Sequence, residues 1–525
     1  MNFLNGLHVL VLGLGDSGLA MARWCARHGA QVTAWDSRDS TPGAATLRNE
    51  WPAVEIISGP LNAERLIGMQ LVLKSPGLAP SDVRVAPLLA EARAIGIAVQ
   101  GELDLFARAL ADMRTDGNYA PQVLAITGTN GKTTTTAMTA MLVARAGKRV
   151  AVAGNIGPTL LDTLSACLGQ PRDERPEVWV LELSSFQLEG GGNGVKGFEP
   201  QAAAVLNITQ DHLDWHGTMA AYTAAKARVF GSAAGSTVTM VVNADDARVE
   251  ALVPQPLVIK GKAKPQPITQ TALRFSLHAP QHPGDFGLVT ENGMAWLVRA
   301  LPVDATFKLK KGEELEIHLQ HLMPADALRV RGRHNAANAL AALSLATAIG
   351  CTLAPMLHGL REYAGEPHRV QPVGMVGEVE AYDDSKGTNV GATVAALDGL
   401  GADKAPSKLV VILGGDGKGQ DFSPLAAPLA RHARAVATIG RDAEAIEAAI
   451  EAAIEAGLHG LHGVPMQRFN TLPAAVNWCF EQARSGDAVL LSPACASLDM
   501  FRNYAHRAEV FVAAVQMLAL ERGQA

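Results

Sequence analysis

Cysteine is scarce in this sequence, and its few occurrences form no recognisable pattern. The 525 residues contain five cysteines, scattered from Cys25 to Cys495. No CxxC pair and no His/Cys spacing typical of zinc sites is present, which argues against both a disulfide framework and a cysteine-based zinc site. The thiol content suits a reduced, cytosolic compartment.

Long apolar runs and an excess of positive charge are also missing. No run approaches the roughly 18 apolar residues that a membrane-spanning helix needs, and Gly13 and Gly15 interrupt the apolar stretch at residues 7–14. That stretch therefore predicts a buried strand and turn, and not a signal peptide. The net charge of −6 argues against nucleic acid or an anionic membrane as the main partner. We expect a cytoplasmic, monomeric protein with no membrane span and no nucleic-acid partner.

Three segments begin with the same pattern of an apolar strand, a glycine-rich turn and a helix. They start at His8, at Val123 and at Glu378, the last with a second strand and turn from Lys408. Continuous apolar strands that alternate with helices predict parallel sheets covered on both faces. A chain of 525 residues exceeds what one core supports. We therefore expect the α/β class with three domains, at residues 1–120, 121–365 and 366–525, and linkers at residues 111–122 and 365–367.

Two stretches look like surface insertions, and one helix is repetitive. Residues 189–197 are rich in glycine, and residues 260–287 are rich in proline and histidine, so both are expected at the surface. The repeat IEAAIEAAIEA, which starts at Ile446, recurs at helical spacing and ends before Gly457. It predicts a packed amphipathic helix without a function of its own.

The first glycine-rich turn has the spacing of a nucleotide-binding loop. Gly13, Gly15 and Gly18 form a complete G-x-G-x-x-G between a strand and a helix, and Asp36 ends the next strand. Such glycines let the backbone approach a diphosphate at a helix N-terminus, and Asp36 stands where dinucleotide folds often carry a ribose ligand. Alone, the motif does not choose among NAD, FAD and a UDP-sugar. The alternative is a glycine turn that only permits close helix–strand packing.

The second turn carries the strongest signal. Residues 127–134 read TGTNGKTT, with Lys132 and Thr133 at the start of the expected helix. Backbone N–H groups of such a loop cradle phosphate oxygens, the lysine reaches the β- and γ-phosphates, and the threonine hydroxyl binds Mg²⁺. Gly128 stands only three residues before Gly131, which departs from the spacing of P-loop kinases and GTPases. We expect an ATP site here.

This loop and the motifs that follow it resemble the Mur ligases and the related folylpolyglutamate synthetases. The further motifs similar to the Mur ligases are, in chain order, GNIG, LELSSFQLE, LNITQDHLDWH, YTAAK, GRHNAANALAA and EPHR. Three more, DDSKGTN, GGDGKGQDF and LSPACASLDMF, are similar to the members that add D-glutamate. The matches run from residue 13 to residue 501, and the DNPR-like motif of the diaminopimelate-adding members is missing.

The resemblance implies a fold and a reaction. It implies a Rossmann-like N-terminal domain that binds a UDP-sugar, a central P-loop ATPase-type domain with a mostly parallel sheet, and a Rossmann-like C-terminal domain that binds an amino acid. The implied reaction is ATP-dependent ligation of D-glutamate to UDP-N-acetylmuramoyl-L-alanine in peptidoglycan precursor synthesis, through an acyl phosphate. Three alternatives stay open: another Mur-type or folate-type ligase, an NAD-dependent oxidoreductase, and a P-loop binding protein without turnover.

Glu182 and His212 suit metal binding. Glu182 follows the apolar run VWVL and His212 lies in a turn after another strand, so both belong at carboxyl ends of strands, where α/β sites form. With the Thr133 hydroxyl they offer ligands for Mg²⁺ or Mn²⁺. The resemblance assigns the metals to these three residues, catalytic roles to Lys132, Glu182 and His212, and a further catalytic metal ligand to a carbamate that CO₂ forms on Lys226. The alternatives are a buried acid paired with a base for Glu182 and a solvated helix lysine for Lys226.

The resemblance also assigns the nucleotide contacts. For ATP it implies Gly128, Thr129, Asn130, Gly131, Lys132, Thr133, Thr134, Asn335, Asn338, Arg369 and Asp384. For the UDP-substrate it implies Asp16, Ser17, Ser37, Arg38, Ser75 and Asn155. Helix capping or packing is the alternative for Asn338, and a solvated surface charge is the alternative for Arg38.

An acidic amine substrate needs positive charge and hydroxyl donors. Lys386, Thr388, Lys418 and Ser497 lie at or near expected strand ends of the third domain. Because Lys418 follows the strand KLVVIL and Ser497 follows the strand AVLL, both turns should open at the carboxyl edge of one parallel sheet. The resemblance adds two residues to the amino-acid pocket, Leu498 and Tyr504, the latter where a phenylalanine is often found.

Overall fold

The computed structural model describes residues 2–191, 195, 197–231, 238–254, 271–304 and 316–524. The chain divides into two compact units. The first comprises Met1–Ile208, His212–Pro324 and Asn338–Leu360, and the second comprises Thr209–Asp211, Ala325–Ala337 and Arg361–Ala525. All five cysteines are buried free thiols, in line with the expectation of no disulfide framework. No helix in the described part of the chain is long and apolar enough to cross a membrane.

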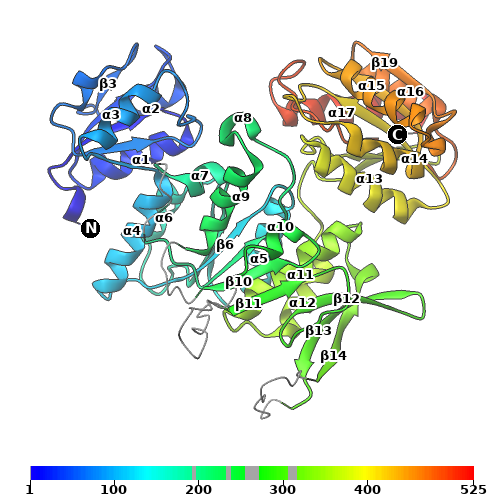
Figure 1. Cartoon of the computed structure of the whole chain (residues 1–525), viewed down its shortest axis with the longest axis horizontal. Helices are drawn as coiled ribbons and strands as arrows, with labels where there is room; N and C mark the ends of the chain where they lie inside the picture. The colour runs from blue at the N-terminus through cyan, green and yellow to red at the C-terminus, as the bar shows by residue number, and fades with distance from the viewer. Residues whose placement is uncertain are drawn as a thin grey trace, which may run out of the picture. The chain divides into compact units, whose positions relative to one another are not determined.

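The first sheet is parallel throughout, and its described strands run in the order β3-β2-β1-β4-β5. Its strands are β1 (His8–Leu12), β2 (Gln31–Trp35), β3 (Glu55–Ile57), β4 (Leu71–Lys74) and β5 (Ala98–Gln100). The accompanying helices, drawn in blue in Figure 1, are α1 (Asp16–Arg27), α2 (Pro42–Glu50), α3 (Ala86–Ala94) and α4 (Glu102–Thr115). The apolar runs HVLVL and LVLK form the central strands β1 and β4, and all of their residues except His8 are buried.

The second sheet is parallel except at one end, where β12, β13 and β14 pair antiparallel. Its described strands run in the order β14-β13-β12-β11-β10-β9-β6-β8-β7. They are β6 (Gln122–Thr127), β7 (Val150–Gly154), β8 (Val178–Glu182), β9 (Ala202–Val205), β10 (Thr239–Asn243), β11 (Thr271–Phe275), β12 (Phe286–Glu291), β13 (Met294–Pro302) and β14 (Ile317–Pro324). The helices are α5 (Lys132–Arg145), α6 (Leu160–Leu168), α7 (Ser185–Glu189), α8 (Leu213–His216), α9 (Met219–Ala227), α10 (Ala247–Glu250), α11 (Arg333–Ala348) and α12 (Leu353–Glu362).

One apolar core joins the first two sheets. A single cluster of buried side chains runs from Leu4, before β1, to Val249 on α10. The helices α1 and α4 both contact α6 of the second sheet. At this contact Arg23 forms an ion pair with Asp162 at 3.1 Å. The two sheets therefore belong to one compact unit.

The third sheet lies in the second unit and is parallel except for its edge strand β15. Its described strands run in the order β15-β16-β20-β17-β18-β19. They are β15 (Gln371–Val376), β16 (Val379–Asp383), β17 (Leu409–Gly414), β18 (Ala433–Ile439), β19 (Met466–Phe469) and β20 (Ala488–Leu491). The helices, yellow to red in Figure 1, are α13 (Val390–Lys404), α14 (Ala426–His432), α15 (Ala443–Glu455), α16 (Leu472–Gln482) and α17 (Tyr504–Glu521). The repeat from Ile446 is a packed helix as predicted, since Ile446 and Ile450 of α15 are buried.

The expected surface insertions are partly wrong. Gly191 is buried so tightly that an added Cβ would lie 1.8 Å from the Val99 carbonyl oxygen of β5. The strand β11 falls inside the second stretch, and its Phe275 is buried, because the apolar alternation of TALRF outweighs the proline and histidine around it. Residues 192–194, 196 and 260–270 lie outside the described residues. The first linker is shorter than expected, because α4 continues to Thr115.

Candidate active site

The phosphate loop between β6 and α5 is held by an asparagine from outside it. The N–H of Asn130 donates to Asn207 Oδ1 at 2.8 Å, and Asn207 Nδ2 donates back to the Asn130 carbonyl at 3.1 Å. Gly131 takes φ +81°, and a Cβ there would lie 2.6 Å from Asn338 Oδ1. Because α5 begins at Lys132, directly after this loop, the helix N–H groups and the positive end of its dipole lie at the loop.

Two lysines donate to one carbonyl of this loop. Lys132 Nζ donates to the Gly128 oxygen at 2.8 Å and to the Thr129 oxygen at 2.7 Å. Lys226 Nζ donates to the same Gly128 oxygen at 2.8 Å. Two ammonium groups that share a carbonyl give the loop a local positive potential, which suits the phosphates of a nucleotide.

Lys226 is a buried residue, so the interpretation of a solvated helix lysine is wrong. It is 2% exposed and shares the buried face of α9 with Tyr222 and Ala225. The Lys226 ammonium lies 4.6 Å from the centroid of the Tyr222 ring. The Tyr222 hydroxyl in turn lies 3.1 Å from Thr129 Oγ1. The buried face of α9 thus reaches the phosphate loop through both Lys226 and Tyr222.

The carboxyl ends of β7 and β8 bring Glu182 and Asn155 together. Glu182 is 3% exposed, and its Oε1 accepts a hydrogen bond from Asn155 Nδ2 at 3.0 Å. The N–H of Asn155 also donates to the Glu182 carbonyl at 2.7 Å. A Cβ on Gly154 would lie 2.1 Å from that carbonyl oxygen, so the glycine of GNIG is what allows the contact. The partner of Glu182 is thus an amide rather than a lysine or arginine.

His212 is held in an uncommon backbone conformation at the start of α8. Its φ is +53°, and its carbonyl accepts from the N–H groups of Trp215 and His216 at 3.2 and 3.0 Å. The ring centroid of His212 lies 4.7 Å from that of Phe186. A left-handed non-glycine residue persists only when its surroundings fix it, and such residues gather at functional sites.

The donor set around the loop suits a hard divalent cation. In the described part of the chain, no three His, Cys, Asp or Glu side chains converge as a ready-made metal cage. A metal here would rest on the Glu182 carboxylate, the Thr133 hydroxyl and the His212 imidazole, completed by oxygens that the chain itself does not supply. Mg²⁺ is bound in this manner, through one or two carboxylates with waters and phosphates.

Asn335 and Asn338 stand on the same helix, α11, but in different units. Asn338 is almost fully buried, and its Oδ1 accepts a hydrogen bond from Thr135 Oγ1 at 3.2 Å, which puts it beside the phosphate loop. Asn335 Nδ2 donates to the Arg331 carbonyl at 2.7 Å. The packing alternative for Asn338 is therefore also satisfied by the structure.

The N-terminal glycine loop lies at the point where the strand order reverses. This point falls between β1 and β4, and ligands of open α/β folds bind in the crevice at such a point. Asp16 is exposed and Ser17 half-buried at the start of α1, and Ser75 is buried after β4. A Cβ on Gly18 would lie 1.7 Å from the Gly13 carbonyl oxygen. The third glycine therefore permits close helix packing, which the alternative interpretation also predicted.

Asp36 holds the protein's own loop rather than presenting a free carboxylate. Its Oδ2 accepts from the Leu14 N–H and its Oδ1 from Arg38 Nε, both at 2.9 Å. Burial alone would raise the pKa of Asp36, but these hydrogen bonds and the Arg38 charge outweigh it and leave the pKa below its usual value. The Arg38 side chain itself is 64% exposed, so it is oriented by Asp36 while its guanidinium stays accessible.

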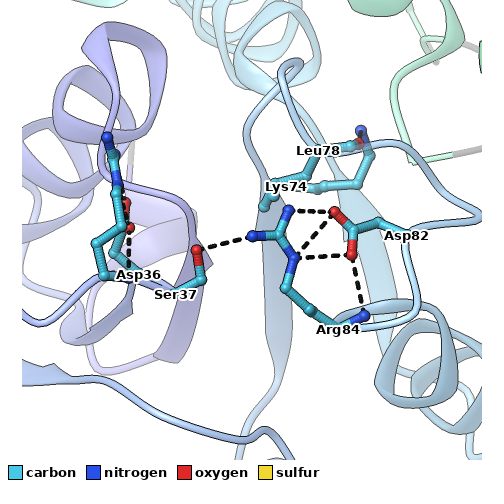
Figure 2. Close-up of polar contacts among 7 residues, drawn as sticks. Asp36, Ser37, Lys74, Leu78, Asp82 and Arg84 are labelled. Atoms are coloured by element: carbon cyan, nitrogen blue, oxygen red, sulfur yellow. Dashed lines mark hydrogen bonds and ion pairs between the residues drawn. The ribbon is translucent and has the colours of Figure 1, made fainter.

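Arg84 joins this site without any signal in the sequence. Figure 2 shows Arg84 between Asp82, with which it forms an ion pair at 2.5 Å, and Ser37. Arg84 Nη1 donates to Ser37 Oγ at 3.0 Å. Ser37 follows β2 and Arg84 follows β4, the strands on either side of β1. The contact therefore joins the two loops that flank the glycine turn.

In the second unit, the residues expected to hold the amino acid follow three neighbouring parallel strands. Lys386 and Thr388 follow β16, Ser497 follows β20, and Lys418 follows β17. The strand β20 pairs in parallel with both β16 and β17, and a backbone bridge joins the turns after β17 and β20. The two turns thus open at one sheet edge, as the sequence predicted.

These side chains differ in exposure. Lys386 Nζ lies 3.9 Å from the centroid of the Tyr504 ring, so two residues assigned to the pocket are in contact. Lys418 is exposed with φ +52°, Ser497 is buried, and Leu498 is 70% exposed. The edge offers a cation over an aromatic ring and a second cation on the adjacent turn.

Asp384 is one of two buried acids at this edge, next to Asp383. Ser492 Oγ donates to Asp384 Oδ2 at 2.6 Å. Burial raises the pKa of Asp384 to about 7, although the Ser492 hydrogen bond and the charge of Arg369 oppose the rise. The structure therefore brings Asp384 and Arg369, both expected at the ATP site, into electrostatic contact within the second unit.

Sequence reasoning missed two residues that hold loops of the site in place. Asn207 holds the phosphate loop, and Arg507 holds two turns of the third sheet. Asn207 lies inside the quoted motif LNITQDHLDWH and could have been singled out there. Arg507, in contrast, stands in no motif. It is fully buried, and its guanidinium donates to the Ser385 carbonyl at 2.9 Å and to the Cys495 carbonyl at 3.1 Å. It joins the turn after β16 to the turn after β20.

Three family models match successive parts of the chain. They are the Mur ligase MurD-like N-terminal domain at residues 7–101, the Mur ligase middle domain at residues 126–346, and the Mur ligase glutamate ligase domain at residues 368–495. These matches cover nearly all of the three sheets, while Ser497, Leu498 and Tyr504 lie beyond the last match. The chain belongs to the Mur ligase family.

Two relatives match this chain over nearly the full length of both chains. The UDP-N-acetylmuramoylalanine–D-glutamate ligase of Albidiferax ferrireducens is 58% identical, over 100% of this chain and 99% of its own. The ligase of the same name from Burkholderia multivorans is 53% identical, over 98% of each chain. The solved MurF ligase of Thermotoga maritima in complex with ADP has a TM-score of 0.56 at 15% identity, over 99% of this chain and 100% of that one, which supports the fold alone.

Proposed function

We propose that the protein joins D-glutamate to UDP-N-acetylmuramoyl-L-alanine with ATP, giving ADP and phosphate, in peptidoglycan precursor synthesis. The observation that carries this proposal is the 58% identity, over the whole chain, to the UDP-N-acetylmuramoylalanine–D-glutamate ligase of Albidiferax ferrireducens. The phosphate loop with its two converging lysines supports it, because an oxidoreductase would have no use for them. The proposal includes domains at residues 1–120, 121–365 and 366–525, a cytoplasmic location and a monomeric state.

The chemistry runs in two steps. The alanyl carboxylate attacks the γ-phosphorus of ATP, a carboxylate oxygen–phosphorus bond forms, and ADP leaves. The amine of D-glutamate then attacks the acyl carbon, and the tetrahedral intermediate loses inorganic phosphate and a proton to give the amide. The first step crowds negative charge between two anions, so its rate depends on positive groups fixed in advance.

The chain's own groups meet that need at the phosphate loop. Residues 128–134 wrap the phosphates with backbone N–H groups, and Lys132 leaves the Gly128 and Thr129 carbonyls to reach the γ-phosphate. Asn335, Asn338, Arg369 and Asp384 complete the ATP site. When bound, Mg²⁺ (or Mn²⁺) supplies charge neutralisation on the phosphate oxygens, with Thr133, Glu182 and His212 as its ligands.

Lys226 is proposed to react with CO₂ and act as a carbamate ligand of a second metal ion. Its Nζ lies within hydrogen-bond distance of the phosphate loop, so a carboxylate built on that nitrogen would stand next to the nucleotide. Burial supports this proposal, because an unmodified ammonium is costly to bury.

The two organic substrates are assigned to the two outer sheets. Asp16, Ser17, Ser37, Arg38 and Ser75 hold the UDP group at the reversal point of the first sheet, and Asn155 contacts the substrate next to Glu182. Lys386, Thr388, Lys418 and Ser497 hold the carboxylates of D-glutamate, with Leu498 and Tyr504 lining the pocket.

The test is phosphate release from ATP with UDP-N-acetylmuramoyl-L-alanine and a panel of amino acids. We expect release with D-glutamate and little with L-glutamate, L-alanine or meso-diaminopimelate. Ligation of another amino acid at a higher kcat/KM would assign the protein to another branch of the family. If the protein instead reduces NAD⁺ and releases no phosphate, the oxidoreductase alternative is favoured.

A further inference from the structure

Lys74 is a buried cation at the carboxyl end of β4 to which the proposed chemistry gives no role. It is 2% exposed. Its Nζ donates to the Leu78 carbonyl at 2.9 Å and to the Ser75 carbonyl at 3.4 Å. Both carbonyls belong to residues 75–78, which we call the β4 loop. Figure 2 shows Lys74 beside Leu78, apart from the Arg84–Asp82 pair. Because burying a charge is costly, its position calls for a reason.

The same ammonium contacts the segment that carries His212. Lys74 Nζ lies 5.2 Å from the centroid of the Trp215 ring, within the range of a cation–π interaction. Trp215 is the third residue of α8, the helix that His212 caps. The ring of Phe186 lies 4.3 Å from that of Trp215 and 4.7 Å from that of His212. Lys74, Trp215, Phe186 and His212 thus form a continuous series of contacts.

A small cavity lies beside Lys74. Its volume is about 10 Å³, room for about one water molecule, and it is lined by Lys74, Pro76, Gly101, Glu102, Phe186, Gln187 and Gly190. Glu102, on its wall, is 2% exposed, and its Oε2 has no hydrogen-bond partner. The contacts of Lys74 with the Leu78 carbonyl and with the Trp215 ring link the β4 loop to α8 beside this cavity.

We propose that Lys74 is a positioning residue that couples the UDP-substrate loop at Ser75 to the orientation of His212. Its ammonium is bonded to protein carbonyls and covered by an indole ring, so it holds the two segments and does not touch the substrate. The inference rests on the proposed function, which assigns Ser75 to the UDP-substrate and His212 to the reacting centre. It implies that occupation of the first sheet steadies the catalytic turn.

The test is a double-mutant cycle on Lys74→Met and Trp215→Leu. We expect each variant to lower kcat about tenfold, and the double variant to be little slower than either one, since both break the same link. The Kd for UDP-N-acetylmuramoyl-L-alanine, measured by calorimetry without ATP, should change less than threefold in Lys74→Met. Lys74→Arg should recover part of kcat, because a guanidinium also stacks on indole.

Arg84→Met supplies the matched control in the same sheet. It removes a cation beside Ser37 that does not reach Trp215, so its effect should multiply with that of Trp215→Leu. Multiplicative effects of Lys74→Met and Trp215→Leu would overturn the coupling, and a tenfold rise in Kd with unchanged kcat would make Lys74 a substrate ligand. If Lys74→Met fails to fold, the same cycle with Lys74→Gln and Lys74→Arg decides the question. A wild type that releases no phosphate with D-glutamate refutes the proposed function instead.

Discussion

Asn207 and Asn130 are joined by a reciprocal pair of hydrogen bonds, in which the Asn207 amide accepts from the Asn130 N–H at 2.8 Å and donates to the Asn130 carbonyl at 3.1 Å. The pair ties the tip of the phosphate loop to the segment that follows β9. Thr129 adds a bond from its N–H to the Asn207 carbonyl at 2.9 Å. The loop shape thus depends on a residue that contacts no phosphate in our proposal.

Asn207→Ala should therefore weaken ATP binding without removing a phosphate ligand. Two net hydrogen bonds of about 0.5–1.5 kcal/mol each are lost, so we expect the KM for ATP to rise about tenfold or more and kcat to fall less. Steady-state kinetics with saturating UDP-substrate and D-glutamate checks this. Asn118→Ala is the control, because Asn118 makes only a surface contact, to Arg172. An unchanged KM for ATP would show that the loop keeps its shape alone.

Lys132→Ala should abolish ligation. Lys132 is the cation at the start of α5, next to the phosphate loop, and removing a main charge stabiliser of phosphoryl transfer costs on the order of 10³-fold in kcat. Lys148→Ala is the matched control, since Lys148 lies just beyond the other end of the same helix. Phosphate release at saturating ATP is the measurement. Near-normal turnover of Lys132→Ala would remove this lysine from the proposed chemistry.

Lys226→Ala should be nearly inactive, and small carboxylic acids such as formate or acetate should partly restore it. The carboxylic acid would replace the oxygen ligand that the carbamate provides. Because Lys226 is buried, the truncation to alanine leaves a space for this acid. The same acids should not restore Lys132→Ala, which loses a cation. Intact-mass or ¹³C-bicarbonate NMR measurements on active wild type should detect the carbamate. An unmodified Lys226 in fully active protein would contradict the proposal.

The strands that carry the glycine turns of all three sheets could be predicted because their signals are local. VWVL and KLVVIL are apolar without interruption, and a residue that ends such a run, like Glu182, must lie at a sheet edge. The common edge of Lys418 and Ser497 followed from the same reasoning. The family resemblance supplied the roles of these residues, which no local pattern contains.

What the sequence could not supply are contacts between residues far apart in the chain. Lys226 looked solvated because it lies on a predicted helix, yet the face of α9 that it shares with Tyr222 and Ala225 is buried and contacts the phosphate loop. Neither Lys74 nor Arg84 was given a role from the sequence, and their partners Trp215 and Ser37 lie on other elements. Residues 189–197 looked like a surface insertion because glycine also signals loops, whereas Gly191 is required by close approach to β5.

Glu102 should make the protein less stable as the pH rises through the range 4.5–7. Burial raises its pKa from 4.5 to about 7, so the folded state keeps the proton that the unfolded state releases. Stability is then lost as pH rises from 4.5, and the loss is complete above about 7, up to roughly 3 kcal/mol. Glu102→Gln cannot ionise, so its unfolding free energy relative to wild type should increase from pH 5 to pH 7.5.

Denaturant unfolding at several pH values measures this difference. The pH range of this measurement is chosen to avoid the titration of Lys74. Burial lowers the pKa of Lys74 to about 8 from 10.5, so its contribution to the free energy of unfolding changes only above pH 8. A Glu102→Gln variant that parallels wild type between pH 5 and pH 7.5 would mean that Glu102 titrates normally in the folded protein.

The last prediction concerns the side-chain carboxylate of the amino acid. Lys418 follows β17 at the sheet edge shared with Ser497, has a left-handed backbone with φ +52°, and is exposed. A charge-assisted hydrogen bond from its ammonium to a carboxylate is worth about 1.5–3 kcal/mol. Lys418→Ala should therefore raise the KM for D-glutamate about tenfold or more, while the KM for ATP changes less than threefold. Lys408→Ala, at the opposite end of the same strand, should change neither.

Neutral amino acids should be poor substrates of the wild type, because they leave a lysine of the pocket without a counter-charge. If Lys418→Ala instead weakens ATP and leaves D-glutamate unaffected, Lys418 belongs to the nucleotide side of the reaction, and the carboxylate must be held by Lys386 on the turn after β16.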